Sequence, residues 1–135
     1  TLHYTAGPAR LGAREIAQFQ LGRVADAATG QKFPAIAYTL VVEGDGRIVL
    51  CHDLDVRCWH SGAVIGGVSR NVSHVGIVYS GDVEPGPAQL VGLREAIAWV
   101  TSQLGRSLQV EGHRDAPYAT ACPGPTWPGW RAAIL

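Results

Sequence analysis

The 135-residue chain has no net charge, because 11 Lys and Arg residues balance 11 Asp and Glu residues. That balance excludes the strongly basic surface with which proteins bind nucleic acid or anionic membranes through overall electrostatic attraction. Long apolar runs are also missing: none approaches the roughly 20 residues that span a bilayer, and the start Thr-Leu-His lacks the order of a signal peptide. We therefore expect a soluble chain that neither binds nucleic acid nor inserts into a membrane.

Cysteine is scarce as well. Three cysteines are too few for a disulfide-dense scaffold. Cys51 and Cys58 are close enough in sequence to bridge a small loop, but two buried free thiols are an equally ordinary interpretation if folding takes place in a reducing compartment. Cys122 is the cysteine that we expect to be unpaired.

Length and composition indicate one globular domain over residues 1–135. Hydrophobic residues make up 47 % of the chain, which is enough for a core at this size, and no internal repeat or linker divides it. The chain begins with Thr instead of Met, and a candidate metal ligand already stands at position 3. We expect the native protein to carry residues upstream of Thr1.

Hydrophobic periodicity predicts an α/β fold. Apolar residues spaced three and four apart indicate a long helix over Pro87–Leu104, ended by Gly105. A shorter helix is expected over Leu11–Gln20, with Ile16 and Phe19 on its inner side. Strands are predicted by β-branched or apolar runs at Tyr38–Val42, Arg47–Cys51, His74–Tyr79 and Leu108–Glu111.

The turns between these segments set the expected topology. Glu43-Gly44-Asp45-Gly46 supplies residues that tolerate positive φ, so the first two strands should form a hairpin, and the apolar run at His74–Tyr79 indicates burial on both faces. Ala25–Pro34 is expected to be a surface loop and Trp127–Leu135 a short helix. The predicted architecture is a central mixed sheet of about five strands, with the long helix on one face and shorter helices on the other.

Three residues suit a metal site. His3 stands in His-Tyr-Thr-Ala, while His113 and Cys122 lie in Gly-His-Arg-Asp and Ala-Cys-Pro-Gly. Two imidazoles and a thiolate suit zinc, and three protein ligands leave one tetrahedral position for water, which distinguishes a catalytic zinc site from a structural one. The set favours a zinc enzyme over a zinc finger.

Five motifs follow one another along the chain. They are His3-Tyr4-Thr5-Ala6, Tyr38 before Asp45-Gly46, Trp59-His60-Ser61-Gly62, Asn71 before Val75-Gly76-Ile77, and Gly112-His113-Arg114-Asp115 before Cys122-Pro123-Gly124. With these motifs the chain resembles the zinc-dependent N-acetylmuramoyl-L-alanine amidases, a family that includes phage endolysins and peptidoglycan recognition proteins. The resemblance extends over nearly the whole chain.

The resemblance implies a peptidoglycan recognition protein-like fold, with zinc held by His3, His113 and Cys122. It implies that Tyr38 is the catalytic tyrosine and that Thr120, two residues before the cysteine, is a second catalytic position. The implied reaction hydrolyses the amide between N-acetylmuramic acid and the first L-alanine of the stem peptide in bacterial peptidoglycan, on the periplasmic or extracellular side of the cell. One form of this interpretation is the catalytic domain of an endolysin whose cell-wall-binding domain is a separate segment.

Elementary chemistry agrees with these roles. Zinc lowers the pKa of bound water from about 15.7 toward about 7 and polarises a carbonyl. A phenol with an ordinary pKa of about 10 is a poor general base at neutral pH, so we expect Tyr38, with Thr120, to donate a hydrogen bond to the developing oxyanion or to orient the water. Neither position carries a carboxylate, which leaves the general base open.

His60 and Asn71 are candidate substrate-binding residues with ordinary alternatives. His60 either contacts substrate from a groove wall or is a structural histidine bonded to a loop carbonyl. Asn71 either bonds the stem peptide or caps its loop, and Asp115 is expected at a turn or behind a ligand. A second, compact zinc site would consist of Cys51, His52, Cys58 and His60. It is disfavoured because Cys51 and His52 are adjacent, and the side chains of adjacent strand residues point to opposite faces of the sheet.

Two rival functions use the same residues. A recognition-type module would bind the muramyl peptide without cutting it, but noncatalytic members of the family typically lack the cysteine that this chain keeps at Cys122. A cysteine hydrolase would pair Cys122 with His113. Chelators would spare the cysteine hydrolase and stop the zinc enzyme.

Overall fold

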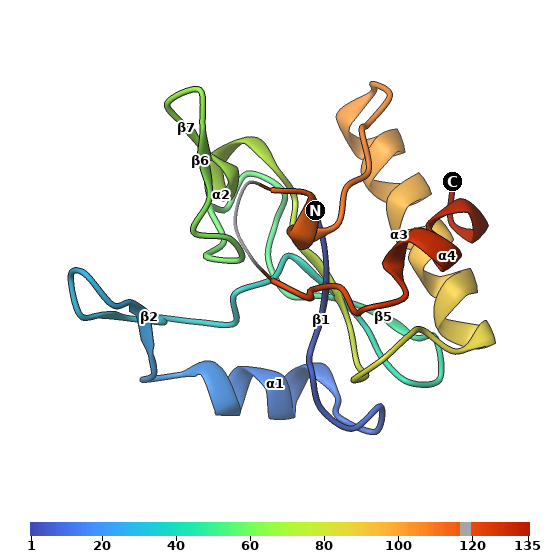
Figure 1. The fold of residues 1–135 in the computed structure, drawn as a ribbon, viewed down its shortest axis with the longest axis horizontal. Coiled ribbons are helices and arrows are strands. Elements are labelled where there is room, and N and C mark those ends of the chain that lie inside the picture. The colour runs from blue at the N-terminus through green and yellow to red at the C-terminus, as the bar shows by residue number, and fades with distance from the viewer. Residues whose placement is uncertain (117–119) are drawn as a thin grey trace.

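The computed structural model describes residues 1–116 and 120–135, and its centre is a four-stranded mixed sheet in the order β1-β8-β4-β5 (Figure 1). Of the two inner strands, β8 is parallel to both of its neighbours, β1 and β4, whereas β4 is antiparallel to the edge strand β5. Each strand has three residues: β1 is Leu2–Tyr4, β8 is Ile77–Tyr79, β4 is Leu40–Val42 and β5 is Ile48–Leu50. The sheet and its flanking helices confirm the predicted α/β class.

The hairpin between β4 and β5 forms at the predicted turn. The Gly46 N–H donates to the Glu43 carbonyl at 2.9 Å, and the Glu43 N–H donates to the Arg47 carbonyl at 2.9 Å. Gly46 has a φ of 87°, a conformation that L side chains rarely adopt and that glycine adopts without strain. The turn therefore needs glycine at this position, as the sequence indicated.

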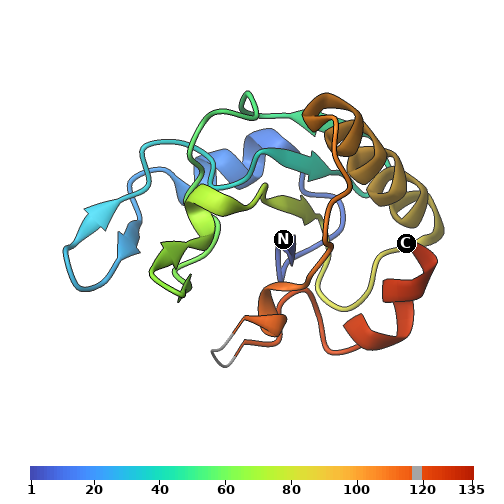
Figure 2. The same ribbon diagram turned by 90° about the horizontal axis from the view of Figure 1, so that it is seen from above.

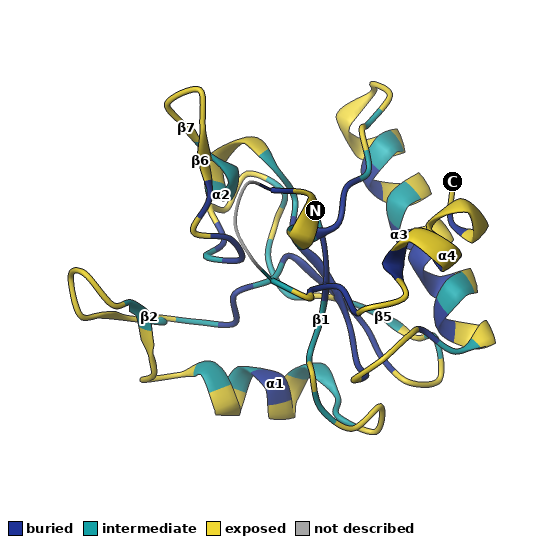
Figure 3. Ribbon diagram, viewed as in Figure 1, coloured by how far each residue is buried: buried dark blue, intermediate teal, exposed yellow. Residues whose placement is uncertain are grey.

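Successive residues of the central strands face opposite sides of the sheet, because strand side chains alternate. Leu40 and Val42 join the core beneath helix α3 (Pro87–Leu104), which ends at Gly105 as predicted. Val41 packs instead in the smaller core beneath α1 (Ala13–Gln20). Figure 1 shows the sheet between these two helices, and Figure 3 shows the centre of the sheet buried. Strands β4 and β8 are buried throughout, whereas the edge strand β5 is intermediate to exposed.

The predicted strand over Leu108–Glu111 is absent, so the sheet of the described residues has four strands instead of about five. The segment does pass beside β1: the Leu2 N–H donates to the Glu111 carbonyl at 2.8 Å, and one parallel bridge joins Leu2 to Gly112. The chain then enters the 3-10 helix His113–Asp115, which ends the pairing after that single bridge.

Two small hairpins were not predicted. The expected loop over Ala25–Pro34 contains part of an antiparallel pair, β2 (Val24–Asp26) with β3 (Gln31–Lys32). A second pair, β6 (Val64–Ile65) with β7 (Val68–Ser69), leads into the one-turn helix α2 (Arg70–Ser73), and Figure 2 shows both hairpins projecting on the side away from α3. Most of their residues are exposed, and strands without a buried face carry no alternating hydrophobic pattern to predict them.

The terminal helices follow the prediction in part. Ile16 is buried in α1, but Phe19 is 66 % exposed and lies under the Arg23 guanidinium, so its predicted place on the inner side is wrong. The tail forms α4 (Trp127–Trp130), whose two tryptophans are buried in the main core, and then a 3-10 helix over Arg131–Ala133. Among the described residues, no helix is both long and apolar enough to cross a membrane.

Candidate active site

Three segments that are distant in sequence bring His3, His113 and Cys122 together. One ligand atom from each residue lies within 4.8 Å of the other two. His3 comes from β1, His113 opens the 3-10 helix His113–Asp115, and Cys122 lies on the segment that returns beside it. The Arg114 N–H donates to the Cys122 carbonyl at 2.7 Å and so ties the last two segments to each other.

Strand alternation explains how His3 reaches this site. Its neighbours Leu2 and Tyr4 pack in or against the core beneath α3, so the side chain between them faces the other side of the sheet. There the His3 ring is only 2 % exposed and lies 4.6 Å from the His113 ring, centroid to centroid. A short strand buried on its other face therefore places a polar ligand inside the protein.

The distances and donor types fit zinc. The Cys122 Sγ lies 3.5 Å from the His3 Nδ1. Zinc bonds of about 2.3 Å to sulfur and about 2.0–2.1 Å to nitrogen, at tetrahedral angles, separate two such ligand atoms by about 3.5 Å. Burial lowers the pKa of His3 well below 6.5 and also lowers the pKa of His113, which favours the neutral imidazoles that bind metals. Burial raises the pKa of the Cys122 thiol to about 11, so a thiolate there needs a cation beside it.

Tyr38 and Thr120 flank the ligands. The Tyr38 ring lies 5.3 Å from the His3 ring, centroid to centroid. Burial raises the pKa of the Tyr38 phenol above the ordinary value, and the nearby Cys122 raises it further. The hydroxyl of Tyr38 is thus protonated at neutral pH. The Thr120 Oγ1 accepts a hydrogen bond from the Cys122 N–H at 3.2 Å, which occupies a lone pair and leaves its own proton to donate.

His60 and Asn71 make contacts within the protein. The His60 ring is 6 % exposed, with Nδ1 at 3.0 Å from the His3 Nε2 and Nε2 at 3.2 Å from the His74 carbonyl, which fits the alternative of a structural histidine bonded to a loop carbonyl. The Asn71 Oδ1 accepts the Ser61 N–H at 2.7 Å and so pins that loop to α2. Contact of either residue with substrate stays a prediction.

The alternative zinc site does not assemble. The His52 Nε2 is bonded to the Ile36 carbonyl at 2.8 Å, whereas His60 faces His3. Cys51 and Cys58 are free thiols, so the small loop between them is not bridged.

A model of the N-acetylmuramoyl-L-alanine amidase family matches residues 1–125. The chain belongs to the N-acetylmuramoyl-L-alanine amidase family. This confirms the resemblance carried by the five motifs, and it supports a protein that cleaves or binds peptidoglycan.

Solved structures show the same fold for this amidase-family chain. The amidase LysC from Clostridium intestinale URNW is 18 % identical, with a TM-score of 0.69 over 91 % of this chain and 73 % of that one. The endolysin of Thermus scotoductus MAT2119 bacteriophage Ph2119 is 23 % identical, with a TM-score of 0.68 over 98 % and 81 %. Drosophila peptidoglycan recognition protein SD is 24 % identical, with a TM-score of 0.73 over 92 % and 72 %. No curated protein sequence matches the chain.

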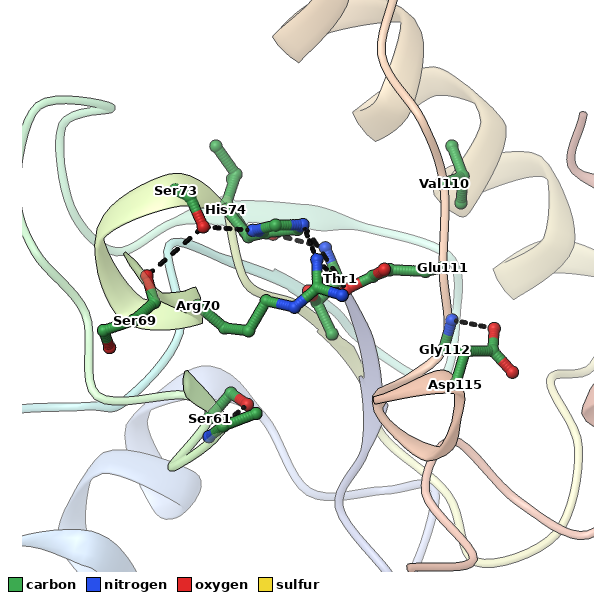
Figure 4. Close-up of polar contacts among 12 residues, drawn as sticks. Thr1, Ser61, Ser69, Arg70, Ser73, His74, Val110, Glu111, Gly112 and Asp115 are labelled. Carbon is green, nitrogen blue, oxygen red and sulfur yellow. Dashed lines mark hydrogen bonds and ion pairs between the residues drawn. The ribbon is translucent and has the colours of Figure 1, made fainter. Parts of the chain in front are cut away.

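A mostly buried ion pair close in sequence to the candidate ligands was not predicted. Arg70 in α2 lies 2.9 Å from the Glu111 carboxylate, and the His74 Nε2 and the Thr1 hydroxyl approach the same oxygen at 3.4 and 3.2 Å (Figure 4). Glu111 is two residues before His113, and Thr1 is two residues before His3. The pair thus joins α2 to both ligand-bearing segments, and sequence offers no signal for it because its members are far apart and follow no period.

A cavity lies on the other side of the sheet from the candidate ligands. Its volume is about 460 Å³, and Leu54, Val100 and Val110 are among its lining residues, on the α3 side of the sheet. None of the three ligand residues lines it. The three candidate ligands therefore converge away from this cavity.

Proposed function

We propose that this chain hydrolyses the amide bond between N-acetylmuramic acid and the first L-alanine of the peptidoglycan stem peptide, with zinc bound by His3, His113 and Cys122. The convergence of these three ligand atoms within 4.8 Å, in a chain of the amidase family, carries the proposal. The proposed substrate is bacterial peptidoglycan at the cell wall, and a separate wall-binding segment in the native protein stays a prediction.

The proposed roles of the residues are metal binding and hydrogen bonding. When bound, zinc supplies a water of lowered pKa and polarises the scissile carbonyl. His3 and His113 contribute neutral nitrogens, and Cys122 contributes a negative charge that offsets part of the cation's charge. Tyr38 and Thr120 keep their protons and donate hydrogen bonds to the oxygen on which negative charge develops.

The rival functions explain fewer of the contacts. A cysteine nucleophile needs a thiolate, an accessible sulfur and a base beside it. Cys122 is 9 % exposed, and burial raises its pKa. A module that only binds peptidoglycan would have no use for three ligand atoms held this close together, which supports the enzyme over the binding module.

Mass spectrometry of the products released from purified peptidoglycan tests the proposal. We expect stem peptides with a free N-terminal alanine, and we expect a chelator to abolish them. Release of only intact muropeptides by zinc-loaded protein would reject hydrolysis in favour of binding. Cleavage that survives chelation but stops on alkylation of Cys122 would favour the cysteine hydrolase.

A further inference from the structure

His60 lies behind the ligand His3, and both of its ring nitrogens are engaged. It belongs to the loop between β5 and β6, and its ring is 6 % exposed. One nitrogen, Nδ1, lies 3.0 Å from the His3 Nε2, and the other, Nε2, lies 3.2 Å from the His74 carbonyl oxygen. The imidazole therefore bridges the backbone before β8 and the side chain of a proposed ligand.

The direction of each hydrogen bond follows from the His74 carbonyl, which only accepts. The His60 Nε2 must carry the proton of that bond, so in the neutral ring Nδ1 is an acceptor. The His3 Nε2 must then donate to it, which leaves the His3 Nδ1 without a proton. That Nδ1 is the atom that lies 3.5 Å from the Cys122 Sγ. The tautomers are assigned from the hydrogen-bond network.

We propose that His60 is a positioning residue, which fixes the tautomer and the ring orientation of His3 so that its Nδ1 is the metal-binding atom. The inference rests on the zinc site of the proposed function. A partner behind a histidine ligand commonly sets its tautomer and raises its basicity. Here the partner is a second histidine, whose own tautomer is set by a main-chain carbonyl.

The surroundings of His60 hold its ring in one place. A Cβ built on Gly76 would lie 2.6 to 2.9 Å from the Cγ, Cβ and Cδ2 of His60, so the ring packs directly on the backbone of residue 76. The next residue along the His60 loop, Ser61, is fixed by its N–H bond to the Asn71 side chain. The glycine at position 76 thus makes room for the histidine that orients His3.

Zinc affinity of His60 variants, measured without substrate, tests the inference. We expect His60→Leu to weaken zinc binding by about 10- to 100-fold, the usual cost of losing a partner behind a ligand. His60→Asn keeps an acceptor oxygen near the place of Nδ1 and should bind zinc more tightly than His60→Leu. The measurement is the zinc dissociation constant, from competition with a chromophoric chelator.

Two further variants separate positioning from general damage. Gly76→Ala keeps every ligand and His60 itself but displaces the ring, and we expect it to weaken zinc binding in the same direction. His52→Leu removes a different histidine, one bonded to the Ile36 carbonyl and outside the ligand cluster, and should leave zinc affinity unchanged. Wild-type zinc affinity in both His60→Leu and Gly76→Ala would overturn the inference.

The ring nitrogens of His3 give a readout that does not depend on zinc. In zinc-free wild-type protein we expect the ¹⁵N shifts of His3 to show a protonated Nε2 and a bare Nδ1. A His3 protonated at Nδ1 would overturn the inference, even if His60→Leu did not fold. If wild-type protein bound no zinc, the proposed function would fail, whereas the tautomer of His3 would still decide the role of His60.

Discussion

The chemistry at the scale of single residues depends on polar groups that are almost completely buried. His3 is 2 % exposed and Cys122 9 %, in a site where burial disfavours every charged form. A bound cation would stabilise the Cys122 thiolate, which burial alone disfavours, and it would bind the imidazoles in their neutral form. The buried site therefore favours neutral side chains, and the thiolate form of Cys122 would need a cation beside it.

Cys122→Ser should remove zinc and turnover together. A serine hydroxyl is a much weaker zinc ligand than a thiolate, so we expect zinc affinity to fall by more than the 10- to 100-fold typical of losing a residue behind a ligand. Metal content after dialysis and the rate of stem-peptide release measure the two losses. Cys51→Ser is the matched control, because Cys51 lies outside the ligand cluster and should keep both properties. Full zinc content in Cys122→Ser would remove this residue from the ligand set.

Tyr38→Phe should keep zinc and lose most turnover. The substitution removes one hydroxyl donor beside the His3 ring, and the loss of such a donor typically lowers the rate by about 10²- to 10³-fold. Steady-state kinetics and zinc content are measured on the same sample. Tyr4→Phe serves as the control, since Tyr4 packs against the core on the other face of the sheet. A Tyr38→Phe protein with the wild-type rate would exclude the phenol from the mechanism.

Among the elements, the contact of α3 with the β4–β5 hairpin fixes the long helix on the sheet. A Cβ on Gly92 would lie 2.4 Å from the Gly46 carbonyl oxygen and 2.9 Å from the Val42 Cγ1. Helix and turn thus meet backbone to backbone at a place where even one methyl group does not fit.

Gly92→Ala should destabilise the protein, although alanine favours helix. The gain in helix propensity is about 1 kcal/mol, whereas overpacking against a backbone that cannot rotate away costs about 1 to 3 kcal/mol. Urea unfolding of Gly92→Ala and of Gly129→Ala, which has open space around its Cβ, checks the sign. We expect the midpoint to fall for Gly92→Ala and to hold or rise for Gly129→Ala. A rise for Gly92→Ala would contradict the packing argument.

The predictability of an element follows from how it is buried. Pro87–Leu104 was predictable to its ends because an apolar stripe repeats along it and Gly105 stops it. The prediction of a strand over Leu108–Glu111 was wrong, because an apolar run does not reveal that backbone pairing with β1 is limited to one bridge. The three candidate ligands were predictable from motifs, whereas the bond from His60 to His3 joins residues 57 positions apart and needed the fold.

For the whole molecule, buried histidines couple stability to pH. Burial lowers the pKa values of His3 and His113, and it lowers the pKa of His60 from 6.5 to about 3. In the unfolded chain these histidines take up protons near pH 6.5, whereas in the folded chain they take them up only at lower pH. Their contribution to the free energy of unfolding is therefore complete above about pH 6.5 and is lost as the pH falls toward the folded pKa values.

We expect zinc-free protein to lose stability between about pH 6.5 and pH 5, by at most about 1.4 kcal/mol per pH unit for each such histidine. Titration of Asp26 affects stability only at lower pH, because the pKa of this carboxyl group is lowered from 3.8. Urea midpoints at several pH values measure the slope, and His60→Leu should reduce it. Midpoints that do not change across this window would contradict the burial of neutral histidines.

A zinc titration of stripped protein tests the central claim most directly. Protein freed of metal by a chelator is given increasing zinc, and stem peptides with a free N-terminal alanine are quantified by mass spectrometry at each step. We predict no release without zinc, a rise in proportion to bound zinc, and saturation at about one equivalent, as a single site with three protein ligands requires. Release of these peptides at the full rate by metal-free protein would contradict the account.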